Sequence, residues 1–177
     1  MKRIAFLSSC ILLLATFAVA QKDKSARPSP PAQAQCSFSD GKNITIDYSS
    51  PRAKGRKVFG DLVPYGEVWR TGANEATAFV TSTNLFVNGK AIPAGNYTIF
   101  TIPNKDKWTL IVNKKTGEWG IPYKYESDEL LRTDMQVSRA GSSVENFNIS
   151  LDQSGASCTM NISWETTKAS VDFKEGK

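Results

Sequence analysis

The residues best suited to chemistry lie between Tyr48 and Thr77, in a stretch rich in basic side chains and glycine. Arg52, Lys54 and Arg56 alternate along the chain, so an extended backbone would project all three side chains from one side. Such a row of cations suits a carboxylate, a phosphate or a sulfated sugar, because Arg offers a planar fork to these groups. The alternative is a solvated loop in which these cations pair with acids of the same stretch, namely Asp61, Glu67 and Glu75.

The second half of this stretch adds an aromatic ring and a candidate ion pair. Trp69 can stack on a sugar or a base, or it can pack in the core as tryptophans of β-domains often do. Arg70 is a candidate partner of Glu75, either in a site or in a fixed loop. The candidate ligand-binding residues are therefore Arg52, Lys54, Arg56, Trp69, Arg70 and Glu75.

Catalysis by carboxylates is an alternative function for the same stretch. Glu75 together with Glu67, Asp61 or Glu118 can form the acid pair of a glycan hydrolase, whose carboxyl separation the sequence does not give. A third possibility is a structural or envelope-interaction protein in which this stretch plugs one end of the fold. No residue is assigned a catalytic role.

The chain contains no histidine, which excludes several kinds of site. Ser-His-Asp and Cys-His catalysis and histidine-ligated zinc or copper are ruled out. No run of acidic residues resembles a calcium loop, so we expect no metal site and no cofactor.

Residues 1–20 have the pattern of a secretory signal peptide. Lys2 and Arg3 precede an apolar run, and a small-residue site follows that predicts cleavage after Ala20. An uncleaved anchor and a lipid-bearing Cys10 are the alternatives. The pattern predicts a secreted or periplasmic protein with no membrane span after cleavage.

Charge and composition describe the rest of the chain as one modest domain. Removal of residues 1–20 leaves 20 basic and 17 acidic residues, a net charge of +3 that is too small to indicate nucleic-acid binding. Residues 21–35 are rich in Pro, Ala and Gln and predict a flexible tether. Residues 36–177 then form a single domain.

Cys36 and Cys158 are the two cysteines that remain after signal cleavage. In an oxidising compartment, we expect them to form a disulfide that ties the first strand to a late one. The alternative is a pair of separate buried thiols.

Short alternating segments with turn signals between them predict an all-β fold. The clearest predicted strands are Asn43–Tyr48, the pair Leu85–Val87 and Lys90–Ile92, Asn96–Pro103 and Trp108–Asn113. Asn88-Gly89 is typical of a type I′ hairpin turn. Further strands are predicted at Ala76–Thr83, Gln136–Arg139, Val144–Asp152, Ser157–Glu165 and Ser170–Phe173, with one helical turn at Asp128–Arg132. About nine or ten strands without an amphipathic helix indicate an antiparallel β-sandwich or jelly roll.

Three long motifs carry a family resemblance: YSSPRAKGRKVFGDLVPYGEVWRTGANEAT, NGKAIPAGNYTIFTIP and WTLIVNKKTGEWG. With them, the chain resembles the bacterial exported family catalogued as domain of unknown function 2911, over roughly Ile44 to Phe173. The resemblance implies a β-rich domain of exported proteins. It brings no activity, substrate or site residue.

The leading hypothesis is therefore an exported domain that binds a small anionic molecule or a glycan. Its ligand, oligomeric state and any catalysis are not encoded in a recognisable motif.

Overall fold

The structure, a computed structural model, describes residues 23–176. The predicted signal peptide and its cleavage point after Ala20 lie outside the described residues. Among residues 23–176, no helix is both long and apolar enough to cross a membrane.

Nine strands and one short 3-10 helix make up the described fold. The strands are β1 (Pro31–Ser37), β2 (Asn43–Ser49), β3 (Thr77–Thr81), β4 (Leu85–Val87), β5 (Lys90–Ile92), β6 (Gly95–Ile102), β7 (Lys107–Asn113), β8 (Glu129–Ser154) and β9 (Ser157–Glu175). The 3-10 helix η1 spans Glu126–Asp128, slightly before the predicted helical turn, whose remaining residues begin β8.

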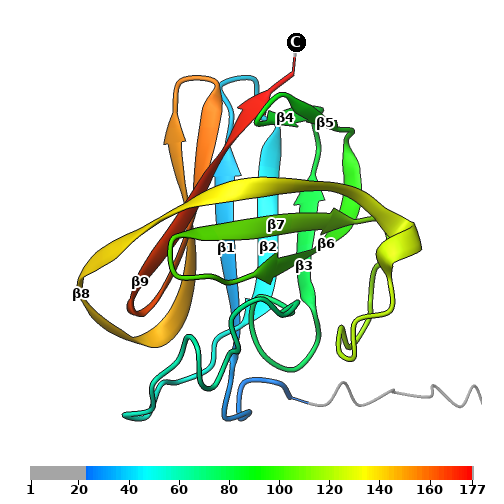
Figure 1. The fold of residues 1–177 in the computed structure, drawn as a ribbon. Helices are drawn as coiled ribbons and strands as arrows, with labels where there is room; N and C mark the ends of the chain where they lie inside the picture. Colours follow the sequence, from blue (N-terminus) through cyan, green and yellow to red (C-terminus); the bar gives the residue numbers. More distant parts are fainter. Residues whose placement is uncertain (1–22, 177) are drawn as a thin grey trace, which may run out of the picture.

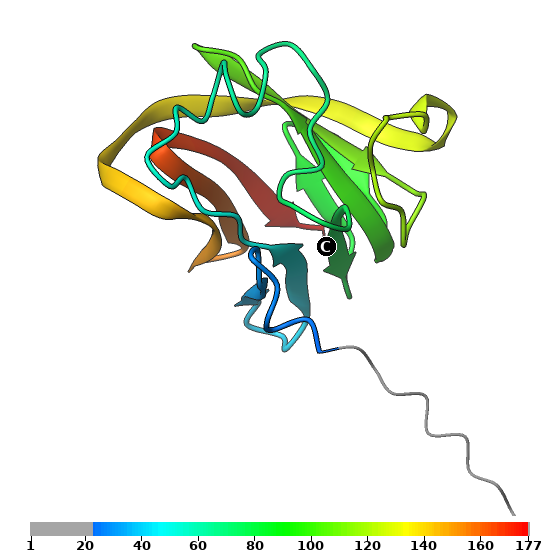
Figure 2. The same cartoon turned by 90° about the horizontal axis from the view of Figure 1, so that it is seen from below.

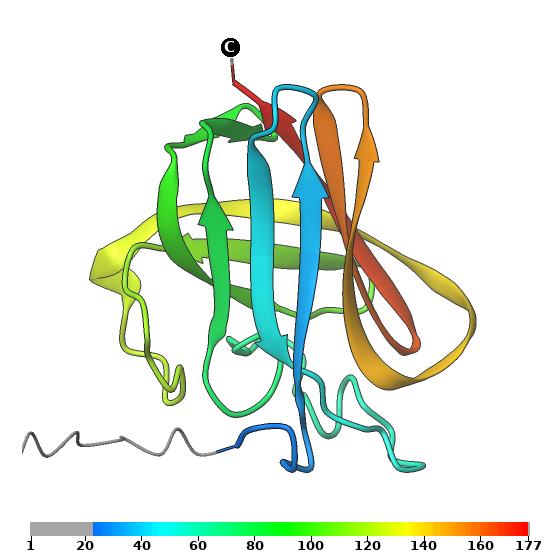
Figure 3. The ribbon, with the colours of Figure 1, turned by 180° about the vertical axis from the view of Figure 1, so that it is seen from behind.

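The strands form a single antiparallel sheet in the order β1-β2-β3-β6-β7-β8-β9-β4-β5. This sheet coils on itself, so that β7 and the first half of β8 cross one side of β1, β2 and β3 (Figures 1 and 3). The predicted all-β, antiparallel, sandwich-like fold is thereby confirmed. At the predicted hairpin turn, Asn88 and Gly89 both have positive φ, of 47° and 78°, as a type I′ turn requires.

Two of the strands are much longer than the sequence pattern predicted. The single strand β8 contains the two predicted strands Gln136–Arg139 and Val144–Asp152. In the same way, β9 contains the predicted strands Ser157–Glu165 and Ser170–Phe173. The register between β8 and β9 shifts between Arg139 and Val144 and again between Val144 and Asn148. Irregularities of this kind bend a strand without ending it, which lets both strands pass from one layer to the other (Figure 1).

The first strand begins earlier than predicted, which corrects the boundary of the tether. The sequence predicts a flexible tether over residues 21–35, but residues 31–35 pair with β2, starting with Pro31 opposite Ser49. Proline is tolerated here because Pro31 is the first residue of β1, a strand at the edge of the sheet.

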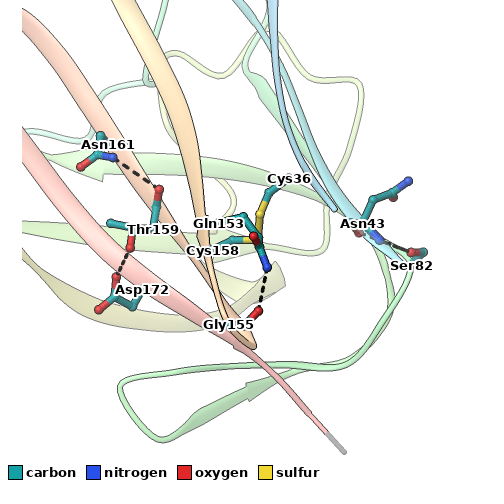
Figure 4. The surroundings of a disulfide bond; sticks show 9 residues. All are labelled: Cys36, Asn43, Ser82, Gln153, Gly155, Cys158, Thr159, Asn161 and Asp172. Carbon is teal, nitrogen blue, oxygen red and sulfur yellow. Dashed lines mark hydrogen bonds between the residues drawn. A yellow bond between two sulfur atoms is a disulfide. The ribbon is translucent and has the colours of Figure 1, made fainter. Parts of the chain in front are cut away.

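The core contains large side chains from both layers, with Trp108, Trp164, Phe79 and Phe147 almost wholly buried. Cys36 of β1 and Cys158 of β9 are joined by the predicted disulfide, with Cα atoms 6.3 Å apart (Figure 4). The bond connects strands far apart in sheet order and is compatible with an oxidising compartment.

Candidate functional site

Two long loops lie at one end of the sheet, where the described chain also begins (Figure 2). They meet where the Ala76 amide donates to the Glu118 carbonyl at 3.0 Å. One loop joins β2 to β3 and the other joins β7 to β8. Between them lies an open pocket of about 810 Å³. Its lining is mostly hydrocarbon and aromatic, with polar groups from Arg56, Glu67, Arg70, Asn74, Glu126 and Ser29.

Two stacked indoles contribute to the wall nearest the core. Trp69 and Trp164 both line the pocket, with ring centroids 6.1 Å apart and planes inclined by 19°. Trp69 also packs edge-on against Phe147 at 5.1 Å, and its indole nitrogen donates to the Gly72 carbonyl at 3.1 Å. Trp69 therefore both packs on the core and lines the pocket, so the two interpretations of this residue are compatible.

The β2–β3 loop seals the end of the core before it forms the pocket. Val58, Phe59 and Val63 are buried, and Phe59 packs against Trp108 with centroids 4.8 Å apart. The Val58 amide donates to a carboxylate oxygen of Glu165 at 3.0 Å, which ties the loop to β9. The loop is thus a rigid support and not a loose connection.

Arg70 is the cation placed deepest in the pocket wall. Its guanidinium donates to the backbone carbonyls of Asn74 and Trp119, and its central carbon lies 5.1 Å from the centroid of the Trp119 ring. Partial burial lowers the pKa of Arg70 because it penalises the charged form. Among the described residues, no carboxylate forms an ion pair with Arg70 or with Arg56.

A glycine brings the second loop close to Arg70. A Cβ at Gly120 would lie 2.9 Å from the Cβ of Ala76 and 3.2 Å from that of Arg70, and φ at Gly120 is +94°. Only glycine fits this approach without movement of the backbone. The neighbouring Trp119 can therefore lie over the Arg70 guanidinium.

The backbone just after Arg70 is held in an unfavourable conformation. Thr71 has φ of 56° although it is β-branched, and it is fully buried. Its hydroxyl bonds to that of Thr101 at 3.1 Å, and the Thr77 hydroxyl donates to its carbonyl at 2.8 Å. A β-branched residue with positive φ is a true outlier, and such outliers concentrate at functional sites.

Tyr123, which lines the pocket from the β7–β8 loop, is fixed by a polar network. Its hydroxyl donates to Glu129 at 2.6 Å and accepts from the side chain of Asn113 at 3.2 Å. Glu129 in turn accepts two bonds of 2.7 Å from Arg132. Burial and the Glu129 carboxylate raise the pKa of Tyr123, whereas Arg132 lowers that of Glu129. The wall is therefore preorganised.

The structure brings three of the six candidate ligand-binding residues together. Arg56, Trp69 and Arg70 line the pocket, while Arg52, Lys54 and Glu75 do not. The expectation of an extended row of cations is wrong, because Lys54 has φ of 52° and the Arg56 amide donates to the Ala53 carbonyl at 3.1 Å, which closes a turn. The Arg52 guanidinium bonds instead to Ser50, at 2.7 Å to its carbonyl and 2.9 Å to its hydroxyl.

The predicted pairing of Arg70 with Glu75 is also wrong. Glu75 accepts from Arg27 at 2.8 Å and lies 3.3 Å from the Lys24 ammonium. These contacts lower the pKa of Glu75 to about 2, with the Arg27 hydrogen bond as the main cause. The Asn74 amide donates to the Ser29 carbonyl at 3.0 Å, so residues just before β1 are bound to the loop that carries Arg70.

The carboxylate pair considered for hydrolysis is divided between two places. Glu67 lines the pocket, whereas Glu75 faces the segment before β1. A second pocket carboxylate is Glu126, which no pattern in the sequence had indicated. The lining residues without a sequence signal of their own include Ile121, Pro122, Tyr123 and Ser29. Trp119, in the motif WTLIVNKKTGEWG, was the one sequence signal close to them.

Within residues 23–176, no group of three or more Cys, Asp or Glu side chains is placed to hold a metal ion.

No curated protein and no solved structure is significantly similar to the chain. Residues 29–173 match the family described as "Protein of unknown function (DUF2911)", which covers nearly the whole described fold. The chain therefore belongs to the DUF2911 family.

Proposed function

We propose that this protein is an exported binding domain that takes a small anionic molecule or a glycan in the pocket between the β2–β3 and β7–β8 loops. Arg70 is the main anchor for the anionic group, Arg56 is a second cation, and Trp69 and Trp119 provide ring surfaces. The function is binding, and no catalytic step is assigned.

The observation that supports this function is the state of Arg70. A partly buried guanidinium normally has a carboxylate partner, because burial of an unpaired charge is costly. Arg70 has only backbone carbonyls and the Trp119 ring around it among the described residues. A bound anion would supply the missing partner and recover this cost.

The strained loop at Thr71 supports the same function independently. Hydrogen bonds to Thr101 and Thr77 hold this conformation, which sets the position of Arg70 and of the backbone that follows. A loop that only sealed the core would need Val58, Phe59 and Val63 but not this strain.

A structural role is the second candidate function, because the buried side chains of Val58, Phe59 and Val63 close the end of the core. The two functions are separated by replacing Arg70 with Met. A purely structural Arg70 predicts a lower melting temperature and no change in binding. The binding function predicts lost binding with a nearly unchanged melting temperature.

The direct test titrates the purified protein with organic carboxylates, phosphate esters, and acidic and neutral sugars. Tryptophan fluorescence is a suitable readout because Trp69, Trp119 and Trp164 line the pocket. We expect at least one anionic compound to bind the wild type but not Arg70→Met. If no compound binds, or if all bind both proteins equally, the proposed function is overturned.

A further inference from the structure

We infer that the ligand is a monoanionic amphiphile, with a single anionic head at Arg70 and an uncharged hydrocarbon or aromatic body along the pocket. This inference rests on the proposed function and narrows its ligand class. Aliphatic and aromatic monoanions share the chemistry that the pocket recognises, and the experiment below includes both.

The apolar lining is the first argument. Beside the indole rings, the pocket is lined by apolar residues of both loops, namely Leu62, Val63, Pro64, Val68, Ala73, Ile121 and Pro122. Each hydroxyl of a saccharide needs a hydrogen-bond partner when it leaves water, and hydrocarbon walls provide none. A hydrocarbon body gains from the same walls, because burial of apolar surface is favourable.

The second argument is the exposure of apolar side chains at the pocket. Trp119, Ile121 and Leu62 are 56%, 42% and 41% exposed. They belong to two different loops, yet all three line this pocket. A clustered set of exposed apolar side chains marks a binding surface more often than scattered ones do. An apolar ligand body would cover them.

The charges of the lining limit the ligand to one negative charge. The charged residues of the lining are the half-buried Arg70, the exposed Arg56, and the exposed Glu67 and Glu126, so their formal charges cancel. The Arg56 guanidinium already donates to two backbone carbonyls, at 2.9 and 2.7 Å. Neither carboxylate forms an ion pair with another described residue. A second anionic group on the ligand would therefore meet repulsion from two carboxylates, which disfavours phosphates and sulfated sugars.

The size of the pocket fits a molecule of this kind. A volume of about 810 Å³ is within the range of pockets that bury most of a small organic ligand. The fixed walls at Trp69 and Tyr123 mean that little ordering is needed on binding.

The test measures binding of four probes to the wild-type protein: dodecanoate, anilinonaphthalene sulfonate, glucuronate and a sulfated disaccharide. The first two are amphiphilic monoanions of aliphatic and aromatic type. The third is a monoanion without an apolar body, and the fourth is a polyanion. We expect dodecanoate, anilinonaphthalene sulfonate or both to bind, and the two sugars to bind at least about tenfold more weakly or not at all.

Three variants locate the binding. Arg70→Met should weaken binding of the monoanions by about tenfold or more, as expected when a charged hydrogen bond is lost. Lys54→Met is the matched control, since it removes an exposed cation outside the pocket. Lys54 has φ of 52°, and Met replaces one non-glycine residue by another at this positive φ, so the backbone strain is the same. Leu62→Asp adds a third carboxylate at an exposed lining position and should also weaken binding, whether or not Arg70→Met folds.

The outcomes separate the inference from the proposed function. Binding of glucuronate or the sulfated disaccharide that depends on Arg70, without binding of the amphiphiles, would overturn the inference and leave the proposed function intact. Amphiphile binding that is unchanged in both Arg70→Met and Leu62→Asp would place it elsewhere and overturn the inference. Failure of all four probes, together with the wider panel above, would overturn both.

Discussion

Arg70 and Trp119, 49 positions apart in the sequence, form a stacked pair at the pocket, with the guanidinium carbon 5.1 Å from the ring centroid. The pair joins the loop after β2 to the loop after β7. Because the ring is largely exposed, the contact contributes little to global stability. Its main effect is to hold a cation and an aromatic surface in a fixed relation.

The first prediction concerns the energy of this pair. A double-mutant cycle of Arg70→Met and Trp119→Ala should give a coupling of about 0.5–1 kcal/mol in urea unfolding. The bond from Arg70 to the Trp119 carbonyl is unaffected by loss of the ring, so the cycle isolates the ring contact. A coupling near zero would mean that the two side chains do not interact in solution.

A second prediction tests the close approach at Gly120. Gly120→Ala should destabilise the fold by about 2–4 kcal/mol, from positive-φ strain together with overpacking against Ala76 and Arg70. Gly117→Ala is the control, because Gly117 has a similar φ of +77° and no atom within 4 Å of an added Cβ. It should cost about 1–2 kcal/mol, the strain alone. Equal losses in the two variants would contradict the approach of the loops.

The pH dependence of stability should reveal the Glu75 ion pairs. Because the pKa of Glu75 falls from 4.5 to about 2 on folding, its contribution is complete above pH 4.5 and is lost as the pH falls towards 2. The Glu75 side chain is 40% exposed, so solvent screening limits the contribution to about 0.5–1 kcal/mol.

The measurement compares urea unfolding of the wild type and Glu75→Gln at several pH values. The difference between the two proteins should be largest at pH 5–7, should shrink as the pH falls towards 2, and should vanish below pH 2, where Glu75 is protonated in both the folded and the unfolded state. High salt should reduce it as well. A difference that is independent of pH would show that Glu75 acts by packing and not by its charge.

The disulfide should contribute substantially to stability. Cys36 and Cys158 are separated by 122 positions, for which chain entropy alone gives about 5 kcal/mol, and measured values are usually nearer 2–4 kcal/mol. Cys36→Ala with Cys158→Ala should therefore unfold at lower urea concentration. Reduction of the wild type should produce a similar loss, and the double variant should be insensitive to reductant.

Local patterns in the sequence predicted the regular part of the fold well. Leu85–Val87 and Lys90–Ile92 were predicted with their observed bounds, because Asn88-Gly89 fixes both the turn and the register. The long strands β8 and β9 were predicted as fragments. Bulges interrupt the alternation of side chains there but not the pairing of the strands.

The candidate site was predicted less well because tertiary contacts determine it. The alternation of Arg52, Lys54 and Arg56 would place them on one side only in an extended backbone, and Lys54 instead lies in a turn. Nothing local indicates that Glu75 pairs with Arg27, 48 positions earlier. Trp119 and Tyr123 reach the pocket only because Gly120 allows two loops to meet.

The pocket lies at the end of the sheet where the described chain begins, while Gly176 is at the opposite end, beside Asn84 (Figure 1). Affinity tags and surface-coupling groups therefore belong after Gly176, where they leave the mouth of the pocket facing bulk solvent. A tag fused directly ahead of Asp23 would crowd Lys24 and Arg27, which pair with Glu75. It would therefore distort the pH dependence of unfolding that is used to measure these ion pairs.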